Sequence, residues 1–321
     1  MSNPAFRTAT GGRIDRSQPI RFTFDGKSYT GFKGDSLASA LLANGVHLMG
    51  RSFKYHRPRG PIAAGSEEPN ALVGIIGSNG RETPNLRATQ IEIYEGLVAE
   101  SQNRWPSLTF DANAVNDLLW PLLPAGFYYK TFMGPRFLGA TRAWKAIYEP
   151  LIRRAAGLGQ ASKSPDPDHY ANRFAHCDVL VIGGGPAGIA AALAASASGA
   201  QVILCDEQAE LGGSLLAETH SRIAGRSPIE WLESALATLA GRANVRLLPR
   251  TQAFGYYADN FVALQERVTD HLANPHPNLP RERLWQVRAR EVVIATGAIE
   301  RPLVFPDNDR PGIMLADAAR T

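Results

Sequence analysis

Cysteine is nearly absent from this 321-residue chain, which contains only Cys177 and Cys205. Two thiols cannot ligate an iron–sulfur cluster, and they are too few for a disulfide framework. Both lie in or beside short apolar runs, so we expect small buried residues. We expect the reducing cytoplasm as the location. The seven histidines are scattered, and no metal-ligand spacing occurs, so we expect no metal site.

Long hydrophobic runs are also missing. The most apolar stretch, residues 118–129, is about half as long as a membrane span and is broken by Pro121 and Pro124. We therefore expect no membrane partner. No charged, apolar and cleavage-site pattern opens the chain, so we expect no signal peptide.

The chain has no strong excess of charge. Its net charge is +4 and its charged fraction is 20%, values that do not indicate a dedicated nucleic-acid binder. Arginine outnumbers lysine by 28 to six. This bias favours planar recognition of phosphates or carboxylates, although a GC-rich genome explains it equally well.

Glycine is concentrated where a dinucleotide would bind. An apolar run over 179–183 predicts a buried strand, and Gly183, Gly185 and Gly188 then satisfy G-x-G-x-x-G before a predicted helix over 187–197. Gly183 permits the turn, Gly185 lets a pyrophosphate approach the backbone, and Gly188 lets the helix lie close to the sheet. The helix N-terminus favours an anion.

A second predicted strand, residues 202–205, ends at Asp206 and Glu207, about 20 residues beyond the glycines, where a ribose-binding acid belongs. Gln208 follows at a position where an NADP-binding protein often has arginine, which favours NAD. The turn over 211–214 offers the cofactor another close approach to the backbone. These features predict a dinucleotide site.

The order of predicted elements indicates an α/β and α+β chain. A flexible basic arm over 1–18 precedes a ferredoxin-like β-grasp domain over 19–104, with strands over 20–24, 28–32, 71–76 and 89–94 and a helix starting at Asp35 or Ser36. A connector and linker follow over 105–172, with a helix over 140–156. A Rossmann-type FAD/NAD(P)-binding domain over 173–321 would contain further strands over 245–248, 252–257, 261–267, 284–289 and 291–295 and a helix over 228–240.

Basic and aromatic residues alternate over 51–60, in the sequence RSFKYHRPRG. Four cations in this segment would be costly to bury without an anion, so we expect it to face a flavin phosphate and a partner subunit. A solvated basic loop is the alternative.

Six stretches together make the chain similar to the α subunit of heterotetrameric sarcosine oxidase. They are RSFKYHRPRG, EEPNALVGI, VIGGGPAGIAAA, LCDEQAELGGSL, FGYYADNFV and VVIATGAIERPLVFPDNDRPGIM. The resemblance implies a cluster-free β-grasp domain, a Rossmann-type region binding NAD, and partner β, γ and δ subunits. It also implies FMN at the interface with the β subunit, with FAD in that subunit. Sarcosine would be oxidised with oxygen as acceptor, and tetrahydrofolate would receive the one-carbon unit.

The resemblance also assigns the NAD contacts, whereas catalytic residues stay unassigned. The contacts are Gly183, Gly185, Pro186, Ala187, Gly188, Asp206, Glu207, Gln208, Ser214, Ala253 beside the adenine, and Gly297. The chain ends before the second dinucleotide half and the folate-binding part of that family, so we expect an N-terminal fragment.

Two other functions stay open. One is a subunit of a related opine or amine dehydrogenase, whose ferredoxin-like domain would normally hold a cluster. Gly65–Glu68 stands where cluster-ligating cysteines would be expected, which argues against it. The other is a non-catalytic scaffolding module that holds a partner subunit.

Overall fold

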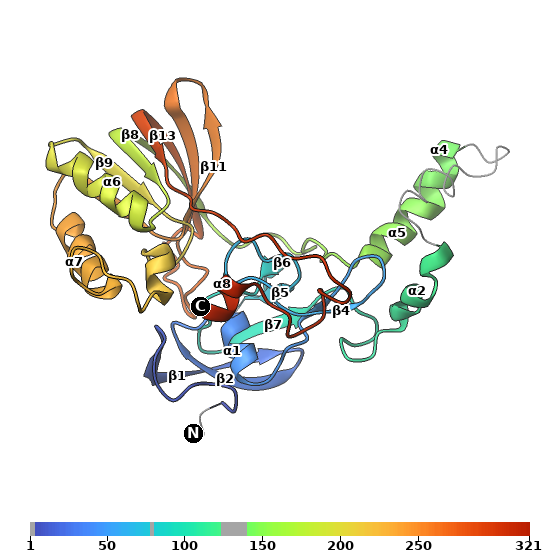
Figure 1. Cartoon of the computed structure of the whole chain (residues 1–321). Helices are drawn as coiled ribbons and strands as arrows, with labels where there is room; N and C mark the ends of the chain where they lie inside the picture. The colour runs from blue at the N-terminus through green and yellow to red at the C-terminus, as the bar shows by residue number, and fades with distance from the viewer. Residues whose placement is uncertain (1–3, 78–79, 123–139) are drawn as a thin grey trace. The chain divides into compact units, whose positions relative to one another are not determined.

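The computed structural model describes residues 4–77, 80–122 and 140–321 (Figure 1). It divides into two compact units. The first comprises residues 1–166 and 301–319, and the second comprises residues 167–300 with the last two residues.

A five-stranded sheet with the order β2-β1-β7-β5-β6 forms the centre of the first unit. Its strands are β1 (Asp15–Phe24), β2 (Lys27–Lys33), β5 (Leu72–Ile76), β6 (Glu82–Arg87) and β7 (Leu97–Ser101). β1 and β7 are parallel, whereas β1–β2, β5–β6 and β5–β7 are antiparallel. A second, two-stranded sheet pairs β3 (Gly50–Arg51) with β4 (Pro58–Arg59). The larger sheet has the β-grasp topology expected from the sequence.

The first hairpin and helix form where their sequence signals predict. Asp25 and Gly26 have positive φ angles of 48° and 75°, which a two-residue turn of this hairpin requires. Helix α1 (Leu37–Ala43) starts at Ser36, whose hydroxyl accepts a hydrogen bond from the Ser39 N–H group. The helix packs its apolar residues into a core that includes Phe22, Phe24 and Leu97.

The strand predicted over 89–94 is wrong, since β6 ends at Arg87 and β7 begins at Leu97. The backbone between them bonds to the start of α1 instead. Leu37 N donates to Ile91 O at 2.8 Å, and Ile93 N donates to Asp35 O at 3.1 Å. The apolar pattern therefore reflects burial against a helix end and not a sheet position.

Part of the predicted N-terminal arm packs on the same core. The Arg7 guanidinium bonds the buried Asp35 carboxylate at 2.7 Å, and the Phe6 ring meets His47 edge-on at 5.8 Å between centroids. β1 begins within the arm, at Asp15.

The remaining elements of the first unit are short helices. They are the 3₁₀ turns η1 (Ala112–Ala114) and η2 (Trp120–Leu122), α2 (Val115–Leu118), α4 (Ala140–Ala143), the π-helical η4 (Trp144–Tyr148), α5 (Glu149–Ala156) and, at the C-terminal end of the chain, α8 (Ala316–Arg320). The helix predicted over 140–156 is confirmed as α4, η4 and α5 in succession. Among the described residues, no helix is long and apolar enough to cross a bilayer. Part of the apolar run over 118–129 lies outside the described residues.

The second unit contains a six-stranded sheet with the order β10-β9-β8-β13-β12-β11. Its strands are β8 (Tyr170–Ile182), β9 (Val202–Cys205), β10 (Val245–Leu248), β11 (Thr251–Tyr257), β12 (Phe261–Arg267) and β13 (Glu282–Ile294). β10, β9, β8 and β13 are parallel, and β11–β12–β13 form an antiparallel meander. The two 3₁₀ turns are η5 (Gly213–Ala217) and η6 (Ala258–Asn260).

Two helices pack on this sheet, as Figure 1 shows. α6 (Pro186–Ala197) buries Ile189, and α7 (Pro228–Ala240) buries Leu232 and Leu239, in a cluster with Val181 and Leu204 of the sheet. α7 begins with a capping box, in which Ser227 and Glu230 bond each other's backbone N–H groups. This is the Rossmann-type arrangement expected from the sequence.

One strand assignment needs correction. The strands predicted over 284–289 and 291–295 are a single strand, β13, which pairs with β8 from Glu282 to Ile294. The sequence signal breaks at Arg290 because a charged side chain there points to solvent, while the backbone pairing continues on both sides.

Candidate functional site

The glycine turn joins β8 to α6, and two of its glycines are required by the protein itself. Gly183 has φ = 106°, and a Cβ atom there would lie 2.3 Å from Ala295 O. A Cβ atom on Gly188 would lie 1.9 Å from Gly183 O. A side chain at either position would clash with backbone, so these glycines set the turn and the close approach of α6.

Gly185 differs from these two. Its φ and ψ of −76° and −175° are open to any residue, and a Cβ atom there would meet nothing closer than Gly213 Cα at 4.0 Å. Gly185 is the N-cap of α6, and no side chain caps the helix. Pro186 follows at the first helical position, and the next N–H groups, of Ala187 and Gly188, are at the positive end of the helix dipole. The fold therefore does not require glycine here, and the open space at the helix N-terminus suits a phosphate.

The second glycine pair lies directly beside this turn. Gly212 N donates to Gly184 O at 2.8 Å, and a Cβ atom on Gly213 would lie 3.0 Å from Gly185 Cα. The exposed Ser214 follows in η5. The structure thus brings the two glycine turns together, as the sequence predicts.

Asp206, at the end of β9, holds the glycine turn in place. One carboxylate oxygen accepts from Gly184 N at 2.6 Å, and the other accepts from Gln208 N at 2.8 Å. Asp206 therefore has a structural task in addition to the ribose contact predicted for it. Glu207 and Gln208 lie half-buried beside it.

The last two predicted contacts come from the meander side of the sheet. Ala253 lies on β11, just after Thr251, whose N–H group donates to Asp206 O at 2.7 Å. Gly297 follows Ala295, whose N–H group donates to Ile182 O at 2.8 Å at the end of β8. The two glycine turns, Asp206 and the start of β11 thus meet at the carboxyl ends of β8 and β9, where ligands of open parallel sheets bind, and Gly297 follows the carboxyl end of β13.

An arginine that the sequence did not predict lies beside the acidic pair. The Arg267 guanidinium donates to Glu207 O at 2.7 Å, and Arg250 N donates to Gln208 O at 2.8 Å. The preference for NAD was based on Gln208 in place of an arginine, whereas Arg267 of β12 brings a guanidinium beside the acidic pair. Arg250 precedes the predicted hairpin over 252–267 and Arg267 ends it, so their proximity could have been inferred from the pairing of its strands.

Two arginines of the basic and aromatic segment form ion pairs with carboxylates within the chain. Arg57 donates to both oxygens of Asp309, at 3.0 and 2.9 Å, and also to Asp307. Arg59 approaches Asp309 at 2.9 Å. A carboxylate some 250 positions away thus supplies counter-charge to these two arginines, and the contact of the segment with a flavin phosphate and a partner subunit stays a prediction.

Arg51 and His56 are held by a third carboxylate. His56 Nδ1 lies 2.6 Å from Asp111 Oδ2, with both side chains buried, and Arg51 Nε lies 3.8 Å from the same oxygen. Arg51 also donates to the carbonyl oxygens of Leu108 and His56. These contacts fix the fold of the segment.

Glu68 lies in the cysteine-free loop of the β-grasp domain. It is fully buried, and its carboxylate accepts four backbone N–H groups. Oε2 accepts from Ile62 and Ala63 at 2.7 and 2.8 Å, and Oε1 accepts from Asn70 and Ala71 at 2.6 and 2.9 Å. Charge-assisted bonds to converging amides compensate the buried carboxylate. The loop is therefore organised by this carboxylate.

Two protein families match the chain, one in each unit. Residues 17–104 match the family described as 2Fe-2S iron-sulfur cluster binding domain, and residues 178–278 match the family described as FAD dependent oxidoreductase. The predicted fold class, a ferredoxin-like domain followed by a Rossmann-type FAD/NAD(P)-binding domain, is confirmed. The cluster family is matched without cysteine in residues 17–104.

Curated relatives agree with the resemblance inferred from the sequence. The sarcosine oxidase alpha subunit of Rhizobium meliloti is 55% identical over 98% of this chain and 31% of its own length, and that of Corynebacterium sp. strain P-1 is 41% identical over 96% and 27%. The chain thus spans about a third of the length of these relatives. A solved L-proline dehydrogenase from P. horikoshii matches 98% of the chain and 46% of its own with a TM-score of 0.59 at 21% identity, which supports the fold alone. The similarity to sarcosine oxidase alpha subunits is confirmed.

Proposed function

We propose that this chain is the nucleotide-binding N-terminal part of the α subunit of a flavin-dependent sarcosine oxidase. The observation that carries the proposal is the 55% identity to such a subunit along nearly the whole chain. At that level the glycine turn, the acidic strand end and the cysteine-free loop are expected to keep their roles. The FAD dependent oxidoreductase match over 178–278 supports an oxidoreductase.

The proposed reaction is oxidative demethylation. Sarcosine would lose a hydride from its N-methyl carbon and a proton from its nitrogen, giving an imine, and flavin would pass the two electrons to oxygen, which with two protons becomes hydrogen peroxide. Water would then release glycine and a formaldehyde-level carbon, which tetrahydrofolate would accept. No catalytic residue of this chain is assigned to that chemistry; its part would be to bind a dinucleotide and contact the flavin-bearing β subunit in a complex with γ and δ subunits.

We place NAD in this chain, with its pyrophosphate over Gly185 and its adenosine toward Asp206 and Ala253. The support is the opening above Gly185, where a side chain would not meet the protein. Asp206 would accept from ribose hydroxyls, although its oxygens also hold the turn. FMN at the β-subunit interface and FAD in the β subunit remain part of the proposal on the strength of the resemblance.

An opine oxidase is the second candidate. One opine oxidase subunit of Agrobacterium tumefaciens is 36% identical over 44% of this chain. Less than half of the chain is covered, and the first unit has Glu68 where that hypothesis expects cluster chemistry. A scaffolding module is the third candidate, and it predicts no bound dinucleotide.

Co-purification separates these functions. The chain in its full-length subunit, expressed with its partner subunits, should yield a yellow complex in which sarcosine bleaches the flavin and produces peroxide. If opines and not sarcosine bleached the flavin, the result would favour the second candidate. A colourless complex without dinucleotide would favour the scaffold and contradict the proposal.

A further inference from the structure

A groove of about 1250 Å³ lies in the first unit, along the connector that follows the β-grasp sheet. One of its walls is the loop over 102–105. The other wall comprises α5 and the residues that follow this helix as far as Ala161. No residue of the dinucleotide turn lines the groove, so it is a separate surface of the chain.

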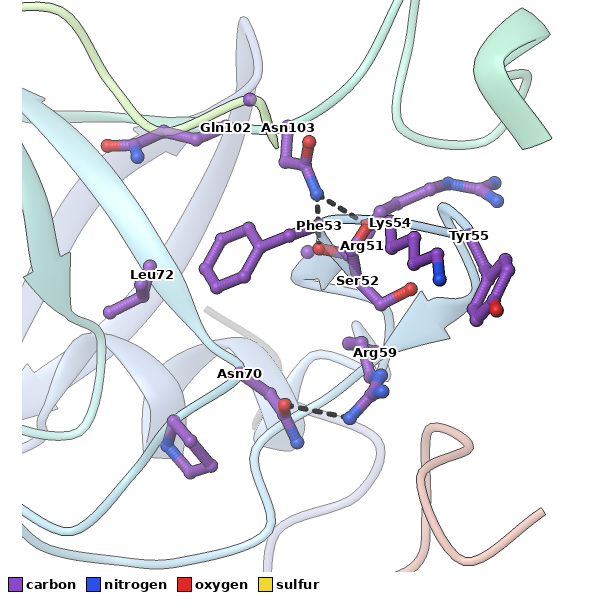
Figure 2. A pocket seen from close by; sticks show the side chains of 13 residues that line it. Arg51, Ser52, Phe53, Lys54, Tyr55, Arg59, Asn70, Leu72, Gln102 and Asn103 are labelled. Carbon is purple, nitrogen blue, oxygen red and sulfur yellow. Dashed lines mark hydrogen bonds between the residues drawn. The ribbon is translucent and has the colours of Figure 1, made fainter. Parts of the chain in front are cut away.

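The C-terminal end of α5 is held against the residues that follow β7. Gly157 ends the helix with a positive φ of 62°, and a side chain at this position would clash with Asn103. Asn103 is fixed in turn, because its amide donates to the carbonyl oxygens of Arg51 and Ser52 at 2.6 and 2.7 Å (Figure 2). The helix that forms one wall of the groove is therefore anchored at its base.

Large apolar side chains in the groove are exposed. Trp105, Leu151 and Leu158 are 64%, 59% and 51% exposed. Within residues 4–166, as far as the structure describes them, Phe6 and Phe53 are the only large apolar side chains outside the connector that are exposed to a similar degree. A concentration of exposed apolar side chains in one segment marks an interaction site.

The helical segment α4–η4–α5 is amphipathic, and its apolar face meets the groove at Leu151. Trp144, Ile147 and Leu151 follow one another at helical spacing, and all three are exposed. The charged side chains between them belong to the opposite face: Arg142, Lys145, Glu149 and Arg153. Because a surface helix is stabilised mainly by packing of its apolar face, this exposed face favours a partner.

The rim of the groove is cationic. It contains Arg104, Arg153 and Arg154. Glu149 is the one carboxylate among the described residues that line the groove, and it already pairs with Arg153. Arg104 pairs with Asp25 at 3.2 Å, whereas the exposed Arg154 forms no ion pair with any described residue. This surplus of positive charge favours an occupant with carboxylates.

We infer that the groove and the apolar face of α4–η4–α5 dock the flavin-bearing partner subunit, through a segment that presents apolar side chains flanked by carboxylates. The inference deepens the proposed function and rests on it, because that proposal supplies the partner. An apolar side chain of the partner fills the space between Trp105 and Leu151, and a neighbouring carboxylate pairs with Arg154. An apolar centre with a charged rim is the usual anatomy of a protein interface.

The test uses the full-length subunit expressed with its partners, and mass photometry on dilution measures the Kd of the flavin-bearing subunit. Leu151→Glu puts a carboxylate into the apolar groove, opposite the carboxylates of the partner, and should raise this Kd at least about tenfold. Leu279→Glu is the matched control, since it makes the same exchange at an exposed leucine of the second unit and should leave the Kd unchanged.

Charge reversal at the rim is the second variant. Arg154→Glu, at an exposed position, should raise the Kd about three- to tenfold and reduce its dependence on salt. Arg173→Glu, at an exposed arginine of β8, should change neither quantity. Circular dichroism and the dinucleotide content of each variant should match those of the native protein, which separates lost docking from misfolding.

Equal Kd values for the native protein, Leu151→Glu and Arg154→Glu would overturn the inference. It would also be overturned if these variants lost a second copy of this chain, or binding to anionic lipid vesicles, while they retained the flavin-bearing subunit. Failure of the proposed function is a different result, namely an assembled complex whose flavin sarcosine does not bleach. The Kd values would test the docking surface in that case too.

Discussion

Glu68→Gln tests whether a carboxylate has taken over the organisation of the cysteine-free loop. The amide keeps one carbonyl oxygen, which can still accept from two of the four backbone N–H groups. Its NH₂ group faces the other two, either Ile62 and Ala63 or Asn70 and Ala71. Two charge-assisted bonds are lost and two donors stay buried without an acceptor, so we expect destabilisation of about 3–5 kcal/mol.

The assay is hydrogen exchange by mass spectrometry combined with urea unfolding, since the chain has two units that need not unfold together. Exchange should accelerate over 62–71 and in α1, while the amides of β8 and β9 keep their protection. Glu67→Gln is the matched control, because Glu67 is exposed and accepts only a 3.3 Å bond from Gly65, so it should change stability by less than about 0.5 kcal/mol. If Glu68→Gln behaved like this control, the carboxylate would not organise the loop.

Three further predictions concern the cysteines, the acidic strand end and the β-grasp domain. Burial raises the pKa of Cys177 to about 11 and that of Cys205 to about 12, so both thiols should resist Ellman's reagent at pH 8 until urea is added. Because these pKa values exceed the unfolded value of about 8.5, their contribution to stability is complete below that pH and falls as pH rises toward 11 and 12, which alkaline unfolding curves should show. Asp206→Asn with Glu207→Gln should weaken NAD binding by about 1–3 kcal/mol, and calorimetry showing NADP bound as tightly as NAD by the native protein would contradict the choice of cofactor. Iron and sulfide analysis after anaerobic purification should find no cluster in residues 20–100, whereas a stoichiometric cluster would refute this.

The dinucleotide turn could be predicted residue by residue because its determinants are local. A strand, three glycines and a helix lie within a few residues of one another, and β9, α7 and β10 begin and end where their apolar runs do. The sequence could not separate the roles of the glycines. Only the backbone geometry shows that Gly183 and Gly188 are required by the fold, whereas Gly185 leaves space for a ligand.

Contacts between distant positions account for the failures. Arg57 and Arg59 pair with Asp309, which lies some 250 positions away in the sequence, and no local sequence pattern predicts this pairing. The arginine beside Glu207 comes from the far strand of a hairpin. Glu68 sits in a loop whose four amides converge only after the β-grasp sheet has formed. In each case the charged residue could be identified from the sequence, but the group that it contacts could not be predicted.

The dinucleotide content of the wild-type protein and of Gly185→Val tests the central claim most directly. Gly185 has an ordinary φ and room for a side chain, so the substitution should leave the fold, the circular dichroism and the unfolding midpoint near those of the wild type. A valine there would occupy the place of the pyrophosphate. The account predicts stoichiometric NAD, released by acid and identified by chromatography, in the wild type and little or none in the well-folded variant. Equal NAD in both proteins, or no NAD in either, would contradict it.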